Sequence, residues 1–170
     1  NEANGHGNSH ATNDNLSWNC GWEGEVNAPE AVLALRRQQA KNFCALLLLS
    51  NGMPMIVAGD EFLNTQRGNN NPYNQDNETT WLDWDRLEKN REVFRFFKLM
   101  IEFRKKHPSI GRPTFWREDV TWHGPDGPAD WTHESRRLAY FLRGASFDDD
   151  DLYVMINAHW EDHDFNVLEG

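Results

Sequence analysis

The sequence predicts an α/β part followed by an all-β part. Between residues 27 and 107, two stretches with helical periodicity flank a short apolar run and a long polar loop. After Gly111 the pattern changes to short strands separated by Gly, Pro and Asp turns. The charge changes at the same place, because residues 1–109 carry 12 basic and 14 acidic side chains and residues 110–170 carry 5 and 13. We therefore expect two domains, residues 1–109 and 110–170.

The first domain is expected to alternate helix and strand. Its first helix starts after Asn27, which can cap it, and runs to about Ser50, ahead of Gly52. The second half of this helix, 43–49, is apolar on all sides, which predicts burial. The run Met53–Ala58 lacks alternation and predicts a strand buried on both faces of a parallel sheet. This order is typical of a (β/α) barrel or a doubly wound sheet.

A second helix is expected at Glu92–His107, with an apolar stripe, basic residues in its last turn and Pro108 as its stop. The second domain is expected to be antiparallel, as in a sandwich. Its strands are predicted at residues 120–123, 137–142, 152–157 and 165–168. The acidic run Asp148–Asp151 is interpreted as an exposed hairpin tip.

Composition excludes several classes of function. The 170 residues carry a net charge of −10, which argues against non-specific nucleic-acid binding. The longest apolar stretch, Phe43–Leu49, is far shorter than the roughly 20 residues of a membrane span. Two cysteines cannot build a disulfide framework and are too few for a zinc site, which favours a reducing, cytoplasmic setting. No nucleophile or phosphate-binding motif is present, and we expect no cofactor and no metal.

Two groups of polar residues are candidates for chemistry. Asp60 and Glu61 follow the expected strand, where barrel enzymes place their sites. Neighbours on a strand point to opposite faces, so the two cannot form the facing carboxylate pair of a glycosidase. One is expected to line a site and the other to accept hydrogen bonds in the wall. His159 and His163 lie near Glu161 in a polar turn, which we interpret as solvated surface.

The polar loop 64–80 allows two interpretations. Its amides, carboxylates and Tyr73 suit a hydroxyl-rich ligand, because amides donate and accept and the ring offers a flat face. Asx turns in a solvated loop would have the same composition. The chain also has eight tryptophans. We expect the four after residue 110 to pack in the sandwich, and the four near loops of the first part to be candidate cleft residues: Trp18, Trp22, Trp81 and Trp84.

Several long motifs carry a resemblance to a known family. They are Asn1–Gly5, Asn13–Gly21, Met53–Met55, Gly59–Phe62 and Gln66–Asn71 in the first part, and Trp122–Gly124, Asp130–Trp131 and Arg137–Tyr140 in the second. With them the chain resembles bacterial glycogen debranching enzymes of the isoamylase type, in the α-amylase superfamily. The resemblance implies the last part of a (β/α)8 barrel followed by a partial antiparallel β-sandwich. It also implies hydrolysis of α-1,6 branch linkages by a retaining mechanism.

The same resemblance implies that all three catalytic carboxylates lie before residue 1. We therefore expect no catalytic residue here, a fragment that is inactive alone, and two partners: a branched α-glucan such as glycogen, and the N-terminal part of the same enzyme. Substrate-side contacts are expected from Asp60, Glu61, Arg67, Asn71, Tyr73 and Asp76. Pro72 and Asn74 depart from the pattern of close relatives in this loop.

Two other functions remain open. The tryptophans would also suit a non-catalytic glucan-binding or structural module. Another reaction of the superfamily, such as that of a trehalose-releasing hydrolase or a pullulanase, would retain the same fold.

Overall fold

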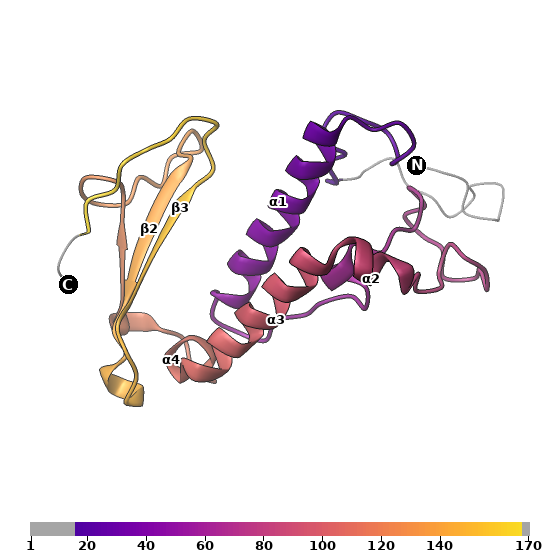
Figure 1. The fold of residues 1–170 in the computed structure, drawn as a ribbon. Helices are drawn as coiled ribbons and strands as arrows, with labels where there is room; N and C mark the ends of the chain where they lie inside the picture. The colour runs from indigo at the N-terminus through magenta and orange to yellow at the C-terminus, as the bar shows by residue number, and fades with distance from the viewer. Residues whose placement is uncertain (1–15, 168–170) are drawn as a thin grey trace. The chain divides into compact units, whose positions relative to one another are not determined.

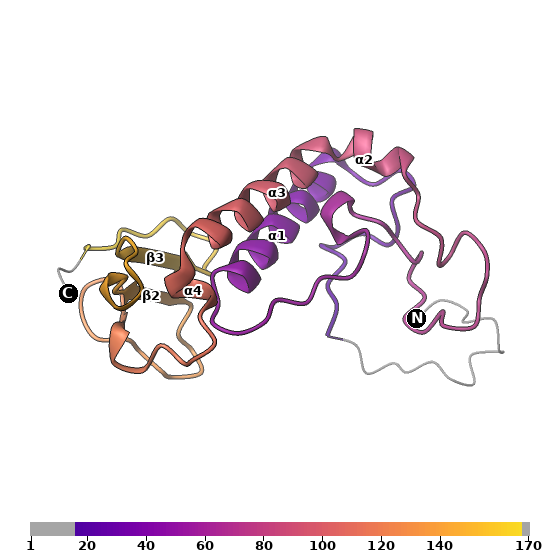
Figure 2. The same ribbon diagram turned by 90° about the horizontal axis from the view of Figure 1, so that it is seen from below.

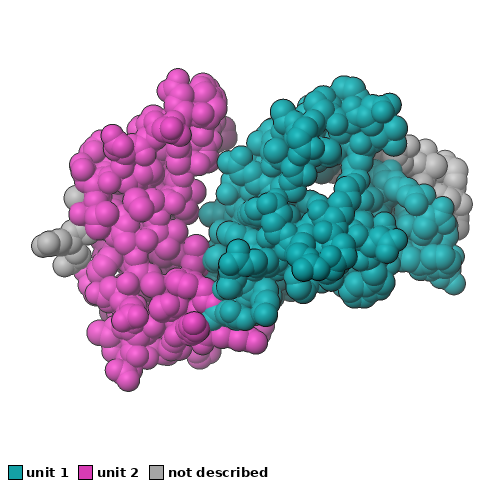
Figure 3. All heavy atoms as spheres, viewed as in Figure 1, with its two compact units in different colours: residues 1–48, 54–102 teal, residues 49–53, 103–170 magenta. Residues whose placement is uncertain are grey.

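The computed structural model describes residues 16–167 and divides the chain into two compact units (Figure 3). Unit 1 contains residues 1–48 and 54–102, and unit 2 contains residues 49–53 and 103–170. The helices are α1 (Glu30–Leu48), α2 (Asp85–Lys89), α3 (Arg91–Lys106) and α4 (Pro108–Gly111), with the short 3-10 helices η1 (Asp60–Phe62), η2 (Arg117–Asp119) and η3 (Ala145–Phe147). The strands are β1 (Val120–His123), β2 (Arg137–Leu142) and β3 (Leu152–Asn157).

Unit 1 is built on α1 and α3, which run side by side (Figures 1 and 2). Both helices form where the sequence predicts them, to within about three residues at each end. Cys44 and Leu48 on α1 pack against Val93 and Phe97 on α3, each pair one helical turn apart. Arg37 and Lys41 of α1 also form ion pairs with Glu92 of α3. Among the described residues, none of the helices has the length and apolar character needed to cross a bilayer.

The expected burial of the whole apolar half of α1 is wrong. Phe43 is 68% exposed and Leu46 is 41% exposed, while only Cys44 and Leu48 are buried between residues 43 and 48. The reason is geometric, because α3 covers a single face of α1 and the other apolar face has no covering element in unit 1.

The predicted strand Met53–Ala58 is also wrong in this structure, where the run is irregular. Met53 and Met55 are 90% and 86% exposed, and Val57 is 67% exposed. A parallel strand needs neighbouring strands to satisfy its backbone groups, and the strands of the described region pair only with one another, in the order β1-β2-β3. The apolar character that favours a buried strand therefore remains on the surface.

Unit 2 is a three-stranded antiparallel sheet with β2 in the centre. All three strands have the predicted bounds, and their register pairs Tyr140 with Trp122 on one side and with Val154 on the other. The core contains Ile110, Trp116, Tyr140 and Leu142. The Tyr140 hydroxyl donates to the Leu49 carbonyl at 2.8 Å, and burial raises the pKa of this phenol to about 12.

The fourth expected strand, Phe165–Leu168, is not formed at residues 165–167, and Leu168 lies outside the described residues. In its place the Asn166 amide donates to the Pro125 carbonyl and the Asn166 carbonyl accepts from Tyr153. The expected tryptophan packing is also only partly correct. Trp116 is buried and Trp122 on β1 is 37% exposed, but Trp131 and Trp160 are 69% and 87% exposed.

The acidic run Asp148–Asp151 is more than an exposed tip, because the Asp149 side chain is only 5% exposed. Its Oδ2 accepts from the Ser109 amide and hydroxyl at the start of α4, and its Oδ1 lies 2.8 Å from His107 Nδ1. Burial alone would raise the pKa of Asp149, but these hydrogen bonds outweigh it and lower the pKa below the ordinary 3.8. This carboxylate therefore joins α4 to the loop between β2 and β3.

Replacing Asp149 should destabilise the protein. The change Asp149→Asn exchanges one acceptor for an amide donor and should lower the free energy of unfolding by about 1–3 kcal/mol. Because the folded-state pKa is lowered, the ionised carboxylate stabilises the fold above pH 3.8, and this contribution is lost as the pH falls below that value. Urea unfolding across this pH range measures both effects. The exposed neighbour gives the matched control Asp150→Asn, and equal losses in the two variants would contradict the assignment.

Candidate functional site

The candidate site lies in unit 1, on the turn around η1 and the loop that follows it. Gly59 begins the turn with φ +100°, and Leu63 ends it with φ +59°. A Cβ on Gly59 would lie 2.6 Å from the Asn64 Cβ, so a glycine is required both by backbone conformation and by space. Phe62 is fully buried, and its ring lies 5.3 Å from that of Trp84. The turn is therefore fixed at both ends and in its centre.

Asp60 and Glu61 lie in this turn and not at the end of a strand. Asp60 Oδ2 accepts from the Val57 amide at 3.1 Å, and Glu61 Oε2 accepts from the Gly59 amide at 3.0 Å. Burial raises the pKa of Asp60, the Val57 hydrogen bond opposes this, and the charge of Glu61 adds to it. Both carboxylates thus bind backbone of their own turn, where the sequence led us to expect only one to do so.

Three asparagines organise the backbone of the loop. Asn64 Oδ1 accepts from the Asp83 amide at 3.0 Å, Asn69 Oδ1 from the Asn71 amide at 2.9 Å, and Asn77 Oδ1 from the Thr79 amide at 2.8 Å. The last two are Asx turns, in which the side chain replaces a backbone acceptor. Part of the amide content is therefore structural.

The other predicted contacts lie on the surface of this loop. Arg67 Nη1 is 3.2 Å from Glu78 Oε1, and both side chains are exposed. Asp76 Oδ1 accepts from Trp81 Nε1 at 2.8 Å, which holds an indole that is 57% exposed. Tyr73 is 68% exposed. Two aromatic rings, an ion pair and several amides are thus presented to solvent by one loop, whereas Asn71 is half-buried.

Sequence reasoning missed the residue that supports this site, Arg86 on α2. Its side chain is 10% exposed, forms an ion pair with Glu25 and donates from Nε to the Leu63 carbonyl at 2.6 Å. The hydrogen bond from Arg86 is the main reason that the pKa of Glu25 is lowered to about 2. Asn90 adds a hydrogen bond to the Phe62 carbonyl at 3.0 Å. Nothing in the sequence distinguishes Arg86 from the other basic residues of the helices.

The tryptophans near loops are exposed in the described structure. Trp18, Trp81 and Trp84 are 57–63% exposed, and Trp22 is 38% exposed. Arg36 on α1 donates to the carbonyls of Asn19, Gly24 and Trp22, so the segment before α1 is held against that helix. These rings are available as flat apolar surfaces.

One group of side chains among residues 16–167 brings together residue types that can ligate a metal ion. His159, Glu161 and His163 in unit 2 offer donor atoms that all lie within 4.8 Å of one another. The sequence alone led us to interpret this turn as solvated surface.

No family model matches this chain. Its similarity to known proteins comes from sequence relatives and from a solved structure. It is 42% identical over 161 residues to "Isoamylase 3, chloroplastic" of Oryza sativa subsp. japonica, covering 94% of this chain and 20% of that protein. It is 36% identical over 178 residues to "Glycogen debranching enzyme" of Dickeya chrysanthemi, covering 100% of this chain and 26% of that protein.

A solved structure shares the fold. The pullulanase of Paenibacillus barengoltzii in complex with maltohexaose and α-cyclodextrin matches with a TM-score of 0.64 and 29% identity, over 79% of this chain and 20% of that one. The class is that of debranching proteins of the α-amylase superfamily. Within this class, the chain belongs to the isoamylase-type glycogen debranching family. It spans about a fifth to a quarter of the length of these relatives, in their C-terminal part.

The Gly59 turn can be tested by substitution. Gly59→Ala should lower the free energy of unfolding by more than about 2 kcal/mol, because the methyl group meets Asn64 and the left-handed conformation is also disfavoured. Gly21→Ala is the control, since its φ of +90° is similar and no atom lies within 4 Å of the added Cβ. It should lose only about 1 kcal/mol. Urea unfolding of both variants measures the difference, and equal losses would mean that the close approach to Asn64 is unimportant.

Proposed function

We propose that this chain is a part of a glycogen debranching hydrolase that cleaves α-1,6-glucosidic branch linkages with retention. The single observation that carries the proposal is its 36–42% identity, along almost the whole chain, to proteins named isoamylase and glycogen debranching enzyme. The pullulanase that shares the fold was solved with maltohexaose and α-cyclodextrin, which supports an α-glucan as the substrate of this chain's enzyme, and the names of the relatives support a branched one such as glycogen.

In this proposal the candidate site forms one wall of the glucan cleft. Tyr73 and Trp81 would stack on sugar rings, since both present exposed aromatic faces and Asp76 orients the indole. Arg67 and Asn71 would bind sugar hydroxyls. Asp60 and Glu61 would do so through the lone pairs that their turn leaves available.

We assign the catalytic carboxylates to another part of the enzyme. A retaining glycosidase needs two carboxyl groups about 5 Å apart on either side of the scissile bond. Asp60 and Glu61 each accept a hydrogen bond from a backbone amide of their own turn, so neither is assigned as nucleophile or acid/base. This chain would therefore contribute substrate binding and no catalytic residue.

The domain assignment follows from the same proposal. Residues 1–109 would be the last part of a (β/α)8 barrel, and residues 110–170 part of a β-sandwich domain that begins with β1, β2 and β3. The exposed apolar run Met53–Ala58 supports the first assignment, because it would become a buried strand beside other barrel strands. The N-terminal part of the enzyme would supply those strands and would be the chain's protein partner.

Location and further partners are inferred from the chemistry of the chain. Cys20 and Cys44 are both free thiols in the structure, which supports a reducing, cytoplasmic location. The net charge of −10 supports a protein that binds neither nucleic acid nor membrane surfaces of the same sign.

A chimera tests the proposed reaction. When this chain replaces the matching region of the Dickeya chrysanthemi enzyme, the product should release linear chains from glycogen, measured as new reducing ends. This chain alone should release none, because general acid and nucleophile are absent. Tyr73→Ala in the chimera should raise KM about tenfold with a smaller change in kcat, since a stacking contact is lost.

Tyr153→Phe in the chimera is the control, because it removes a hydroxyl in unit 2 that donates to the Asn166 carbonyl and lies outside the candidate site. Its KM should be unchanged. A folded but inactive chimera, or debranching by this chain alone at the rate of the intact enzyme, would overturn the proposal.

The proposed protein partner predicts how this chain behaves alone. The exposed apolar surface of Phe43, Met53, Met55 and Val57 should cause self-association, which light scattering after size-exclusion chromatography measures as a mass above one chain. Phe43→Ser with Met55→Ser should shift the population toward monomer. Val26→Ser with Val167→Ser removes similarly exposed apolar side chains elsewhere and should not. A cooperative, monodisperse monomer of the unaltered chain would contradict the prediction.

A further inference from the structure

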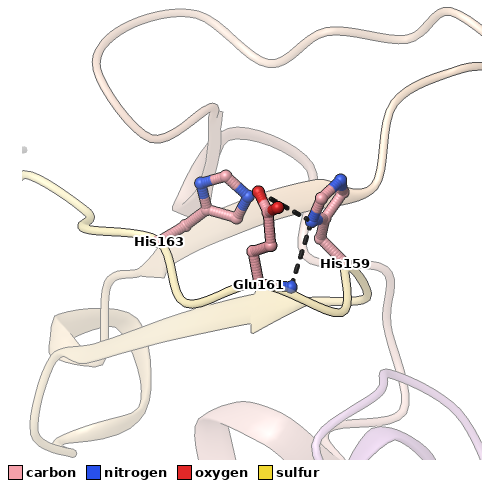
Figure 4. A group of neighbouring side chains, drawn as sticks. All are labelled: His159, Glu161 and His163. Carbon is pink, nitrogen blue, oxygen red and sulfur yellow. Dashed lines mark hydrogen bonds and ion pairs between the residues drawn. The ribbon is translucent and has the colours of Figure 1, made fainter.

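The turn that follows β3 brings two imidazoles and a carboxylate together, as Figure 4 shows. Asn157, the last residue of β3, shapes this turn: its Oδ1 accepts from the His159 amide at 2.9 Å and its Nδ2 donates to the Glu161 carbonyl at 2.8 Å. His159, Glu161 and His163 are spaced two residues apart in sequence. The Asn157 side chain therefore organises the backbone of this turn before any ligand binds.

The donor atoms lie close to the separation that a small cation needs. His159 Nδ1 is 4.0 Å from Glu161 Oε2, and the ligand atoms of all three residues lie within 4.8 Å. Tetrahedral ligands about 2.0–2.1 Å from a zinc ion are roughly 3.3 Å apart, so modest side-chain rotations would close the site. His159 Nδ1 now accepts from the Glu161 amide at 3.1 Å, which shows that its lone pair points into the turn.

The second observation is an unsatisfied imidazole nitrogen. His163 Nε2 is buried and has no hydrogen-bond partner in the described part of the chain. In Figure 4 this ring turns a nitrogen toward the Glu161 carboxylate. A buried polar nitrogen without a partner is costly, so such a group calls for a ligand. A cation between His163, Glu161 and His159 would satisfy it.

The surroundings have room for a hydrated ion. A cavity of about 270 Å³ is lined by both histidines and by Asp130, Glu134, Arg136 and Arg137, among others. Arg137 Nη1 lies 3.4 Å from His163 Nδ1, and it would have to turn away because the Nδ1 of a neutral imidazole bound through Nε2 carries the proton. Arg137 is exposed and can do so.

We propose that His159, Glu161 and His163 bind one divalent transition-metal ion of the zinc class. Two imidazoles and one carboxylate suit zinc and its neighbours, whereas calcium and magnesium prefer oxygen ligands alone. Water from the cavity would occupy the remaining position. The ion would tie the turn after β3 into a closed loop beside β2, a structural role that is independent of the proposed glucan chemistry.

Zinc binding to the 170-residue chain tests the proposal directly. Isothermal titration with Zn²⁺ should give one site per chain. His163→Ala and His159→Ala should each lower the affinity for Zn²⁺ at least about tenfold, and Glu161→Gln should also lower it. His133→Ala is the matched control, since this exposed histidine of unit 2 lies outside the cluster. All variants keep the histidines before residue 16, so a difference in Zn²⁺ affinity between the cluster variants and His133→Ala reports on the cluster alone.

A second measurement reports the place of binding. The Trp160 ring stacks on His159 with centroids 4.2 Å apart, so Cu²⁺ bound at His159 should quench its fluorescence. The quenched fraction should fall in Trp160→Phe and in His163→Ala, with far-UV circular dichroism confirming that each variant is folded. Equal Zn²⁺ affinity in folded His163→Ala and His133→Ala, or Cu²⁺ quenching that is the same with and without Trp160, would overturn the proposal.

Discussion

The buried guanidinium of Arg86 is the interaction on which the candidate site depends. It joins three segments distant in sequence: Glu25 before α1, Leu63 at the end of the η1 turn, and α2, which carries it. Removing Glu25 from its ion pair with Arg86 would leave a buried charge unmatched, which is far more costly than losing an exposed ion pair. Because the turn carries Asp60 and Glu61 and leads into the loop with Tyr73, the Arg86 side chain supports the start of the loop that holds the candidate contacts, together with Asn90.

The exposed apolar surface has a physical explanation of its own. An amphipathic helix needs one covering neighbour, and α3 finds it in α1. A helix that is apolar on all sides, or an apolar strand of a parallel sheet, needs several neighbouring elements to bury its surface. Phe43 and Met55 are exposed because those neighbours are not part of unit 1, which supports the proposal that this region belongs to a larger barrel.

The local backbone of the candidate site was predictable, but its contacts were not. Gly and Asn favour left-handed and Asx-turn backbones, which the structure has at Gly59 and in the amide-rich loop, whereas glucan binding by this loop stays a prediction. The sequence did not reveal that both Asp60 and Glu61 bind backbone amides, nor that Asp149 is buried in a run of four acidic residues. Those outcomes depend on which segments approach from elsewhere.

The sequence by itself determined the local elements, helices α1 and α3 and the three strands, because their bounds follow from periodicity, capping residues and turns. It also determined membership in the debranching family, because the sequence motifs carry that resemblance. Only the tertiary structure decided which apolar residues are covered, that Arg86 supports the site, and that His159, Glu161 and His163 converge. The physical reason is that periodicity and capping act within a few residues, whereas burial and ligand geometry are set by contacts between segments far apart in sequence or by the exact path of a turn.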